Sequence, residues 1–209
     1  MSRAFVIVGA DTNVGKTVFA AALADALGAH YWKPVQAGLT PETDSQTVAR
    51  LGGLSPDRIV PEAWRLPTPA SPHIAARAAG VNIDVVALHP PRSVAHMIIE
   101  TAGGVMVPLT EDFLTIDLLA RWRLPAILVA RTGLGTINHS LLTLEALRRR
   151  DIAVQGVAFV GDEDAAVQQS IATIGGVRQL GRLPRLDPLN RETLRAAFAA
   201  HFSMQDFLT

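Results

Sequence analysis

The residues best suited to chemistry in this chain of 209 residues lie in the stretch Gly9-Ala-Asp-Thr-Asn-Val-Gly-Lys-Thr17. It follows a short apolar run, Phe5 to Val8, and leads into an alanine-rich run, Thr17 to Leu27, whose apolar residues recur at helical spacing. Backbone N–H groups that open a helix are unpaired and lie at the positive end of the helix dipole, so they bind phosphate well. The stretch therefore predicts a phosphate-binding loop between a strand and a helix.

Three residues of this loop are suited to the roles that residues have in a P-loop. Gly15 lets the backbone approach a phosphate closely, Lys16 can reach the β and γ phosphates, and the Thr17 hydroxyl is placed to ligate Mg²⁺. The strict pattern requires glycine where this chain has Ala10, and the glycine stands one residue earlier, at Gly9. The loop is thus a variant. A turn that binds nothing is the less favoured interpretation, because Gly-Lys-Thr follows a strand and opens a helix.

Three charged residues elsewhere are candidates for the same site. Lys33 lies on a predicted strand, His30 to Val35, and Asp44 lies in the first turn of a predicted helix, Thr43 to Leu51. Glu100 ends an apolar strand and, if buried, needs a cation or a basic partner. A strand-end lysine is commonly an ordinary surface charge, and an acidic first-turn residue commonly serves the helix dipole. Beside a phosphate loop, however, the ends of parallel strands are where ligands collect.

The elements that must position these residues alternate between strands and helices. We predict strands over residues 5–8, 30–35, 95–100, 125–130, 154–160 and 179–182, and helices over 17–27, 43–51, 71–77, 113–122, 140–150, 163–174 and 191–202. The proline-rich stretch 56–72 is expected to be mostly irregular. This order predicts an α/β fold: a single-domain, three-layer, P-loop NTPase-like fold over residues 1–209. Its mostly parallel sheet is covered by helices on both faces.

The composition excludes several classes of function. Apolar residues make up 49% of the chain, enough for one sizeable core, and 19 basic residues balance 19 acidic ones, so no net positive field gathers nucleic acid. With no cysteine there is neither a disulfide framework nor a thiolate ligand, and no apolar run is long enough to span a bilayer. We expect a cytoplasmic protein that binds small molecules, with no nucleic-acid or membrane partner.

With these stretches placed, the chain resembles the dethiobiotin synthetase family over most of its length. The displaced first glycine of the P-loop matches that family's variant loop. The other shared motifs follow in the family's order: Lys33-Pro-Val35, Asp44, Ser71-Pro-His73, Glu100 with Ala102-Gly-Gly104, and Ile137-Asn-His139. An ordered set of this kind is much more specific than the Gly-Lys-Thr sequence, which many NTPases share.

The resemblance implies an ATP- and Mg²⁺-dependent ligase of biotin synthesis. Such an enzyme takes 7,8-diaminononanoate and CO₂, phosphorylates the carbamate formed on one amine, and lets the second amine close the ureido ring, releasing ADP and phosphate. It also implies a homodimer whose amine substrate lies at the subunit interface.

The resemblance further implies roles for individual residues. The metal would be surrounded by Thr17, Asp44 and Glu100, and the catalytic residues would be Lys33, Lys16 and Thr12. Nucleotide contacts would come from Asn13, Val14, Gly15, Lys16, Thr17, Val18, Asp44, Glu100, Thr101, Ala102, Gly103, Gly161, Asp162 and Pro184. The substrate would contact Ala37, and its tail carboxylate the backbone N–H groups of Gly135, Thr136, Ile137 and Asn138.

The chain departs from the family pattern at three places. Ala37 stands where the family usually has serine or threonine, and Gln36 beside it is a candidate replacement for the missing hydroxyl. Gly161-Asp162 stands where the family usually has an asparagine-aspartate pair that reads the base, so nucleotides other than ATP remain possible. The segment before Glu100 is short, which affects the expected interface more than the chemistry.

Two other classes of enzyme or switch compete with this interpretation. Cobyrinate amidating enzymes carry a further domain with a cysteine nucleophile, and this chain has no cysteine. ATP-switched dimers of the MinD/ParA kind carry a lysine early in the loop, where this chain has Ala10-Asp11, and act on DNA or membrane through a basic patch or tail. The C-terminal residues Ser203 to Thr209 include no basic residue.

A catalytically inactive nucleotide-binding module is the remaining alternative. The departures at Ala37 and Gly161 favour it. The joint presence of two lysines and two carboxylates suited to phosphoryl transfer argues against it.

Overall fold

The computed structural model describes residues 3–91 and 96–208. Within them, seven strands form one sheet in the order β4-β2-β6-β1-β7-β8-β9, and every neighbouring pair runs parallel. The strands are β1 (Ala4–Gly9), β2 (His30–Trp32), β4 (Ile59–Val60), β6 (Met97–Gly104), β7 (Ala126–Arg131), β8 (Val154–Val160) and β9 (Gln179–Leu183). The predicted α/β fold with a parallel sheet is confirmed.

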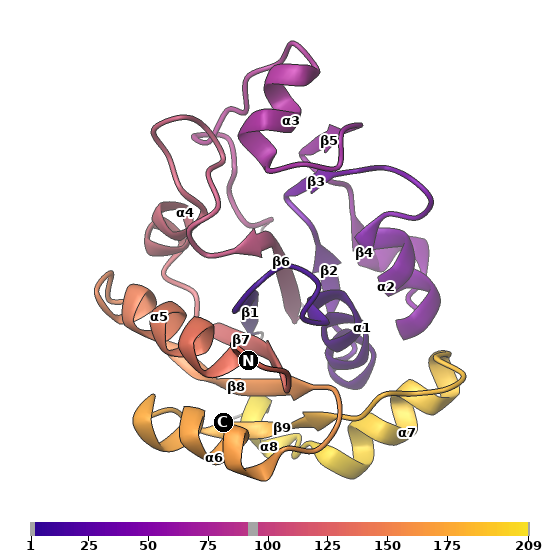
Figure 1. The fold of residues 1–209 in the computed structure, drawn as a ribbon. Coiled ribbons are helices and arrows are strands. Elements are labelled where there is room, and N and C mark those ends of the chain that lie inside the picture. Colours follow the sequence, from indigo (N-terminus) through magenta and orange to yellow (C-terminus); the bar gives the residue numbers. More distant parts are fainter. Residues whose placement is uncertain (1–2, 92–95, 209) are drawn as a thin grey trace.

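Helices cover both faces of this sheet (Figure 1). Alternate residues of β1 explain why two layers are needed: Phe5 and Ile7 enter one buried apolar cluster, and Val6 and Val8 enter the other. The first cluster is completed by α1 (Lys16–Leu27), α2 (Asp44–Gly52), α7 (Arg191–His201) and α8 (Gln205–Leu208). The second is completed by α4 (Thr115–Trp122), α5 (Thr136–Arg148) and α6 (Ala165–Ile174). No described helix has the length and apolar character needed to cross a membrane.

A second, two-stranded sheet lies beyond the end of the main one. It pairs β3 (Val35–Ala37) with β5 (Trp64–Leu66), and α3 (Pro72–Ala78) packs on it (Figure 1). The prediction of one strand from His30 to Val35 is therefore wrong. The chain leaves the main sheet at Lys33-Pro34, where proline has no N–H to continue the β2–β6 ladder, and pairs afterwards with a different strand.

Other boundaries also differ from those predicted. The irregular stretch 56–72 contains a 3₁₀ turn (η1, Pro56–Arg58) and the short strands β4 and β5, which are held by pairing with distant strands. Helix α5 begins at Thr136, four residues before the predicted Ser140. Strand β6 does not end at Glu100 but continues to Gly104. Ala95, where that strand was predicted to start, lies outside the described residues.

Candidate active site

The loop between β1 and α1 has the conformation of an anion-binding turn. Asn13 and Gly15 both have positive φ, 58° and 95°, and Gly15 is the N-cap of α1 without any side-chain cap. A Cβ at Gly15 would lie 2.8 Å from the side chain of Val160 on β8, so glycine is required by space as well as by conformation. The first-turn N–H groups of α1 therefore remain available for a phosphate.

The displaced glycine of the loop allows the path taken by Lys16. The Lys16 Nζ donates a hydrogen bond to the backbone oxygen of Asp11 at 3.1 Å, closing the loop on itself. A Cβ at Gly9 would lie 2.7 Å from that Nζ and 2.6 Å from the Asp11 oxygen. Burial lowers the pKa of Lys16 to about 8, with nearby Glu100 acting in the opposite direction. Lys16 is thus a desolvated cation in the loop.

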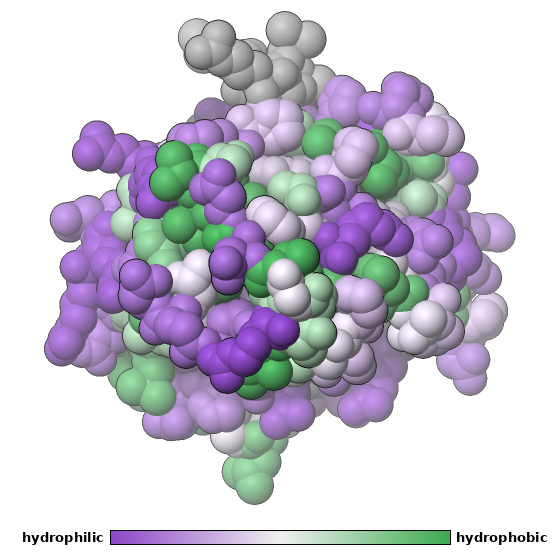
Figure 2. Space-filling model, turned by 90° about the horizontal axis from the view of Figure 1, so that it is seen from above, coloured by the Kyte–Doolittle hydropathy of each residue, from purple (hydrophilic) through white to green (hydrophobic). Residues whose placement is uncertain are grey.

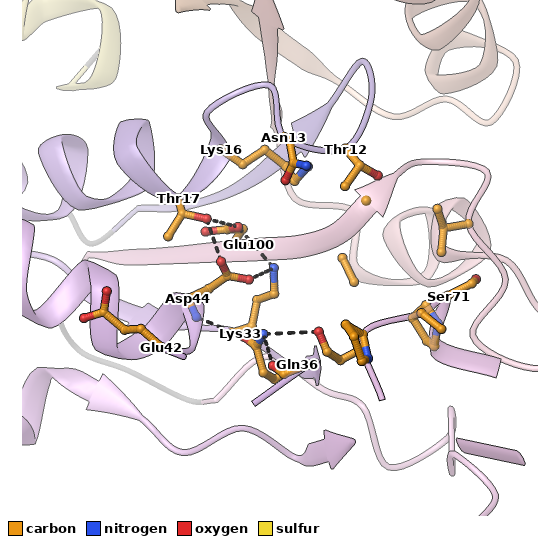
Figure 3. Close-up of a pocket in the computed structure, with 18 of the residues that line it drawn as sticks. Thr12, Asn13, Lys16, Thr17, Lys33, Gln36, Glu42, Asp44, Ser71 and Glu100 are labelled. Carbon is orange, nitrogen blue, oxygen red and sulfur yellow. Dashed lines mark hydrogen bonds and ion pairs between the residues drawn. The ribbon is translucent and has the colours of Figure 1, made fainter. Parts of the chain in front are cut away.

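A network of charged and polar groups lies beside the loop (Figure 3). The Lys33 Nζ is 2.8 Å from Asp44 Oδ2 and 3.1 Å from Glu100 Oε1, and it also donates to the backbone oxygen of Thr101. The Thr17 hydroxyl is within hydrogen-bond distance of the same two carboxylates, at 2.8 Å from Asp44 Oδ1 and 2.9 Å from Glu100 Oε1. Four predicted residues from separate elements therefore meet at one point.

Electrostatics keep Lys33 and Asp44 charged. Burial alone would lower the pKa of Lys33, but the carboxylates of Glu100 and Asp44 outweigh it and raise that pKa. Burial alone would raise the pKa of Asp44, but the positive charge of Lys33 outweighs burial and lowers that pKa. The lysine and the aspartate therefore stabilise each other's ionised forms.

The position of Asp44 is held by two neighbouring residues. Thr43 caps α2 in a reciprocal capping box with Gln46, which confirms the predicted cap. The Gln36 side-chain oxygen accepts a hydrogen bond from the Asp44 backbone N–H at 3.2 Å, and its amide donates to the backbone oxygen of Gly38 at 3.0 Å. From the sequence, Gln36 was a candidate to replace the hydroxyl missing at Ala37. In the structure its side-chain amide binds backbone groups of Gly38 and Asp44 instead.

A cavity of about 810 Å³ opens over the loop and the network (Figure 3). Twelve of the predicted site residues line it: Thr12, Asn13, Gly15, Lys16, Thr17, Val18, Lys33, Ala37, Asp44, Glu100, Ala102 and Gly103. Sequence reasoning did not assign Gly38, Thr40, Glu42, Pro69, Ala70, Pro72 and Val107 to it. Most of these come from the small sheet and its loops, whose place over the P-loop depends on the unpredicted pairing of β3 with β5.

Comparison with known proteins places this chain among close relatives. The family described as AAA domain matches residues 3–193. The ATP-dependent dethiobiotin synthetase BioD of Agrobacterium fabrum is 62% identical, over 100% of this chain and 98% of its own. That of Nitrobacter hamburgensis is 56% identical, over the same shares of the two chains. The chain belongs to the dethiobiotin synthetase family.

Solved structures with a similar fold share much less sequence with this member of the dethiobiotin synthetase family. The cell division ATPase MinD of Pyrococcus furiosus has a TM-score of 0.56 and 15% identity, covering 94% of this chain and 89% of that chain. A ParA family ATPase from Chlorobium tepidum has a TM-score of 0.52 and 14% identity, covering 95% and 91%. These likenesses confirm the P-loop NTPase-like fold, and at such identities they show the fold alone. The MinD/ParA alternative is not favoured, because the relatives at 56–62% identity over the whole chain are dethiobiotin synthetases.

Three residues predicted to contact the nucleotide lie outside the cavity, at the ends of β8 and β9. The Gly161 N–H donates to the backbone oxygen of Leu183, which brings Gly161 beside Pro184. Asp162 pairs with Arg185 at 3.1 Å. Gly161 has a φ of 129°, and a Cβ there would lie 2.6 Å from the Thr132 hydroxyl. The asparagine that the dethiobiotin synthetase pattern led us to expect does not fit this backbone.

Two other predicted nucleotide contacts are buried beside the cavity rather than in its lining. Val14 belongs to the apolar cluster between α1 and the sheet. The Thr101 hydroxyl donates to the backbone oxygen of Ile7 across the β1–β6 pair. Both side chains support the loop and strand that carry the site.

The predicted contacts for the substrate tail lie at the start of α5, also outside the cavity. Gly135 is its N-cap with a φ of 87°. Thr136 is buried, and its hydroxyl has no hydrogen-bond partner in the described part of the chain. His139 Nδ1 lies 3.6 Å from Asp11 Oδ2, so this helix start is next to the P-loop. The structure therefore brings the two helix N-termini close together without joining them in one cavity.

The donor set beside the P-loop fits a magnesium ion. Mg²⁺ prefers oxygen ligands and usually takes one or two carboxylates while keeping several waters. Thr17, Asp44 and Glu100 supply a hydroxyl and two carboxylates that already converge. No group of three or more His, Cys, Asp or Glu residues that could hold a metal ion occurs within residues 3–91 and 96–208.

Proposed function

We propose that this chain is an ATP-dependent dethiobiotin synthetase that converts 7,8-diaminononanoate and CO₂ to dethiobiotin, with ATP giving ADP and phosphate. The observation that carries the proposal is the meeting of Lys33, Asp44, Glu100 and Thr17 beside the P-loop. The dethiobiotin synthetases at 56–62% identity over the whole chain support the assignment of substrate.

The chemistry requires negative charge to be held in one place. One amine and CO₂ form a carbamate and release a proton, and a carbamate oxygen then attacks the γ-phosphorus of ATP while ADP leaves. The second amine attacks the carbonyl carbon of this mixed anhydride, the amine loses a proton as phosphate leaves, and the ring closes. The approach of an anionic carbamate to an anionic triphosphate is the step at which cations help most.

The residues of this chain supply that charge. Lys16 and the first-turn N–H groups of α1 would hold the β and γ phosphates, and Lys33, raised in pKa and fixed between Asp44 and Glu100, would face the transferring group. Thr12, in the lining of the same cavity, would contact the carbamate. Thr17, Asp44 and Glu100 would hold Mg²⁺, which when bound offsets charge on the phosphates.

The direct test is product formation by the purified protein. It is incubated with 7,8-diaminononanoate, bicarbonate, Mg²⁺ and each nucleoside triphosphate in turn, and both phosphate and dethiobiotin are measured, the latter by mass spectrometry. We expect one phosphate per dethiobiotin, and the series reveals which nucleotides the base site with Gly161 accepts. Phosphate release that does not depend on the diamine, or the absence of product with every nucleotide, would contradict the proposal.

We further propose a homodimer in which the substrate tail is held by the N–H groups of Gly135, Ile137 and Asn138, since the N–H of Thr136 already donates to the backbone oxygen of Gly133 at 3.2 Å. These residues lie outside the cavity, and neighbouring Leu134 is fully exposed, as are large parts of Met106 and Leu142, at 52% and 57%. On the face seen in Figure 2, apolar groups lie in patches between polar ones. An exposed apolar side chain such as Leu134, directly before the predicted tail site, is surface that a second subunit can cover.

Mixing two impaired variants, assayed with the diamine far below its KM, tests whether the site is shared between subunits. Lys33→Met removes the catalytic lysine, and Ile137→Pro removes one N–H of the tail site and should keep about a tenth of normal activity at low diamine. If each site combines residues of both subunits, mixing and reassembling the two variants recovers up to about a quarter of normal activity, because some heterodimers contain one intact site. If each site lies within one subunit, the mixture is no more active than the average of the two variants alone. Sedimentation of the unmixed protein gives the oligomeric state independently.

A further inference from the structure

The Tyr31 side chain makes a contact that the proposed chemistry does not yet use. Its hydroxyl donates a hydrogen bond to Glu100 Oε2 at 2.8 Å, and the tyrosine is fully buried. Tyr31 is paired with Ile98 in the β2–β6 register, and Glu100 is two residues beyond Ile98. Side chains two apart on a strand share a face, so the phenol and the carboxylate point to the same side of the sheet.

The two oxygens of Glu100 have different partners. Oε1 lies 2.9 Å from the Thr17 hydroxyl and 3.1 Å from the Lys33 Nζ, on the cavity side. Oε2 is the oxygen bound by Tyr31. Glu100 is 1% exposed, so water does not readily replace a lost donor. The carboxylate is therefore oriented by three donors, of which one comes from outside the predicted site.

The contact between the Tyr31 hydroxyl and Glu100 is shielded from solvent. Tyr31 is 0% exposed and Glu100 is 1% exposed, so water does not readily compete for the hydrogen bond between them. The ring fills a place in the apolar cluster under α1, which a phenylalanine would fill equally well.

We propose that Tyr31 is a positioning residue for phosphoryl transfer, because its hydroxyl holds Glu100 Oε2 and thereby presents Oε1 to Thr17, Lys33 and a bound Mg²⁺. The inference rests on the proposed function for the reaction it serves. Without the hydroxyl, Oε2 is buried without a donor, and the carboxylate is free to turn about its terminal torsion. Partners that orient metal-binding side chains in this way typically change metal affinity or activity 10- to 100-fold when removed.

The variant Tyr31→Phe removes only the hydroxyl. Binding of ADP is measured by calorimetry with and without Mg²⁺, which does not depend on turnover. We expect ADP alone to bind within about twofold of normal, while the gain in affinity caused by Mg²⁺ falls about tenfold. In the assay of dethiobiotin formation, kcat falls about tenfold and KM for the diamine changes little.

Thr143→Val is the matched control. Its buried hydroxyl donates to the backbone oxygen of His139 on α5, so the variant also removes one buried hydroxyl but leaves Glu100 untouched. We expect it to lose stability to a similar extent with no change in the Mg²⁺ effect. If Tyr31→Phe behaves like this control, or weakens ADP binding equally with and without Mg²⁺, the hydroxyl is structural and the inference is overturned.

A double variant keeps the inference testable if the single one folds poorly. If Tyr31 acts through Glu100, adding Tyr31→Phe to Glu100→Gln changes Mg²⁺-dependent ADP binding no further, whereas independent effects would add. Failure of the proposed function would give a different result. The unsubstituted protein would then form no dethiobiotin, but the effect of Mg²⁺ on ADP binding would still show whether Tyr31 positions Glu100.

Discussion

The N-termini of α1 and α5 differ in how many binding groups this chain places around them. At α1, the loop is flanked by a network in which the buried Lys33 is paired with the half-buried Asp44 at 2.8 Å and with the buried Glu100 at 3.1 Å. At α5, the turn before the helix is exposed, and the buried Thr136 hydroxyl has no partner in the described residues. The first site is therefore preorganised within one chain, and the second has the features of a site that other molecules complete.

Removing Lys33 should give the largest loss of stability and activity, because Lys33 is the cation that pairs with both carboxylates beside α1. In Lys33→Met, Glu100 is left buried without its cation, so the free energy of unfolding in urea should fall by about 3 kcal/mol. We expect kcat to fall on the order of 10²- to 10³-fold. The double variant Lys33→Met with Glu100→Gln should recover most of the stability and none of the activity. Recovery of activity as well would mean that Lys33 is only a structural counter-ion.

Ile137→Pro should give the next largest effect and separates the two ends of the site. Proline is tolerated in the first turn of a helix but removes an N–H that would bind the substrate tail. We expect KM for the diamine to rise about tenfold with KM for the nucleotide unchanged. Ala166→Pro, at the same position of α6, is the matched control and should change neither. Equal effects of the two variants on KM for the diamine would mean that the start of α5 does not bind the substrate.

The ionisation of Lys16 should have a moderate, pH-dependent effect on the α1 side alone. With a pKa of about 8, Lys16 is charged below pH 8 and increasingly neutral above it. A bound phosphate favours the cation, so ADP binding should take up a proton above pH 8 and weaken by up to about tenfold for each further pH unit. Calorimetry in buffers of different ionisation enthalpy measures this uptake. Lys16→Arg, which stays charged, should show none.

Ala37→Ser, in the lining of the cavity, should give the smallest effect. A new hydroxyl should lower KM for the diamine about two- to tenfold if it reaches an amine, and leave KM for the nucleotide unchanged. Ala70→Ser on the same cavity is the control, for which we expect no change. An equal change in both variants would indicate a general effect of polarity in the cavity.

The sequence was sufficient for the parts of the site that follow from local pattern. The strand, loop and helix around Lys16 and the capped start of α2 at Thr43 were predicted because each depends on neighbours in the chain. The order of strands in a parallel α/β sheet then brings Lys33 and Glu100 together at one edge. The roles of these residues stay predictions until activity is measured.

Contacts between distant segments were beyond the reach of these patterns. The split at Lys33-Pro34 and the pairing of β3 with β5 depend on strands of three residues that carry almost no periodic signal. The contact of Tyr31 with Glu100 was missed for a similar reason, since a tyrosine in a strand usually signals packing alone. Only the β2–β6 register, known from the fold, places its hydroxyl on the carboxylate.

The conformation of Gly161 limits which side chains can stand at the predicted base site. A side chain there would both require a φ of 129° and meet the Thr132 hydroxyl on the neighbouring loop. An asparagine introduced alone should be harmful, and a change at Thr132 alone should bring no benefit. Positions 161 and 132 are thus coupled by space, so a library that varies one residue at a time would miss any side chain at 161 that needs a smaller residue at 132 and a rearranged turn.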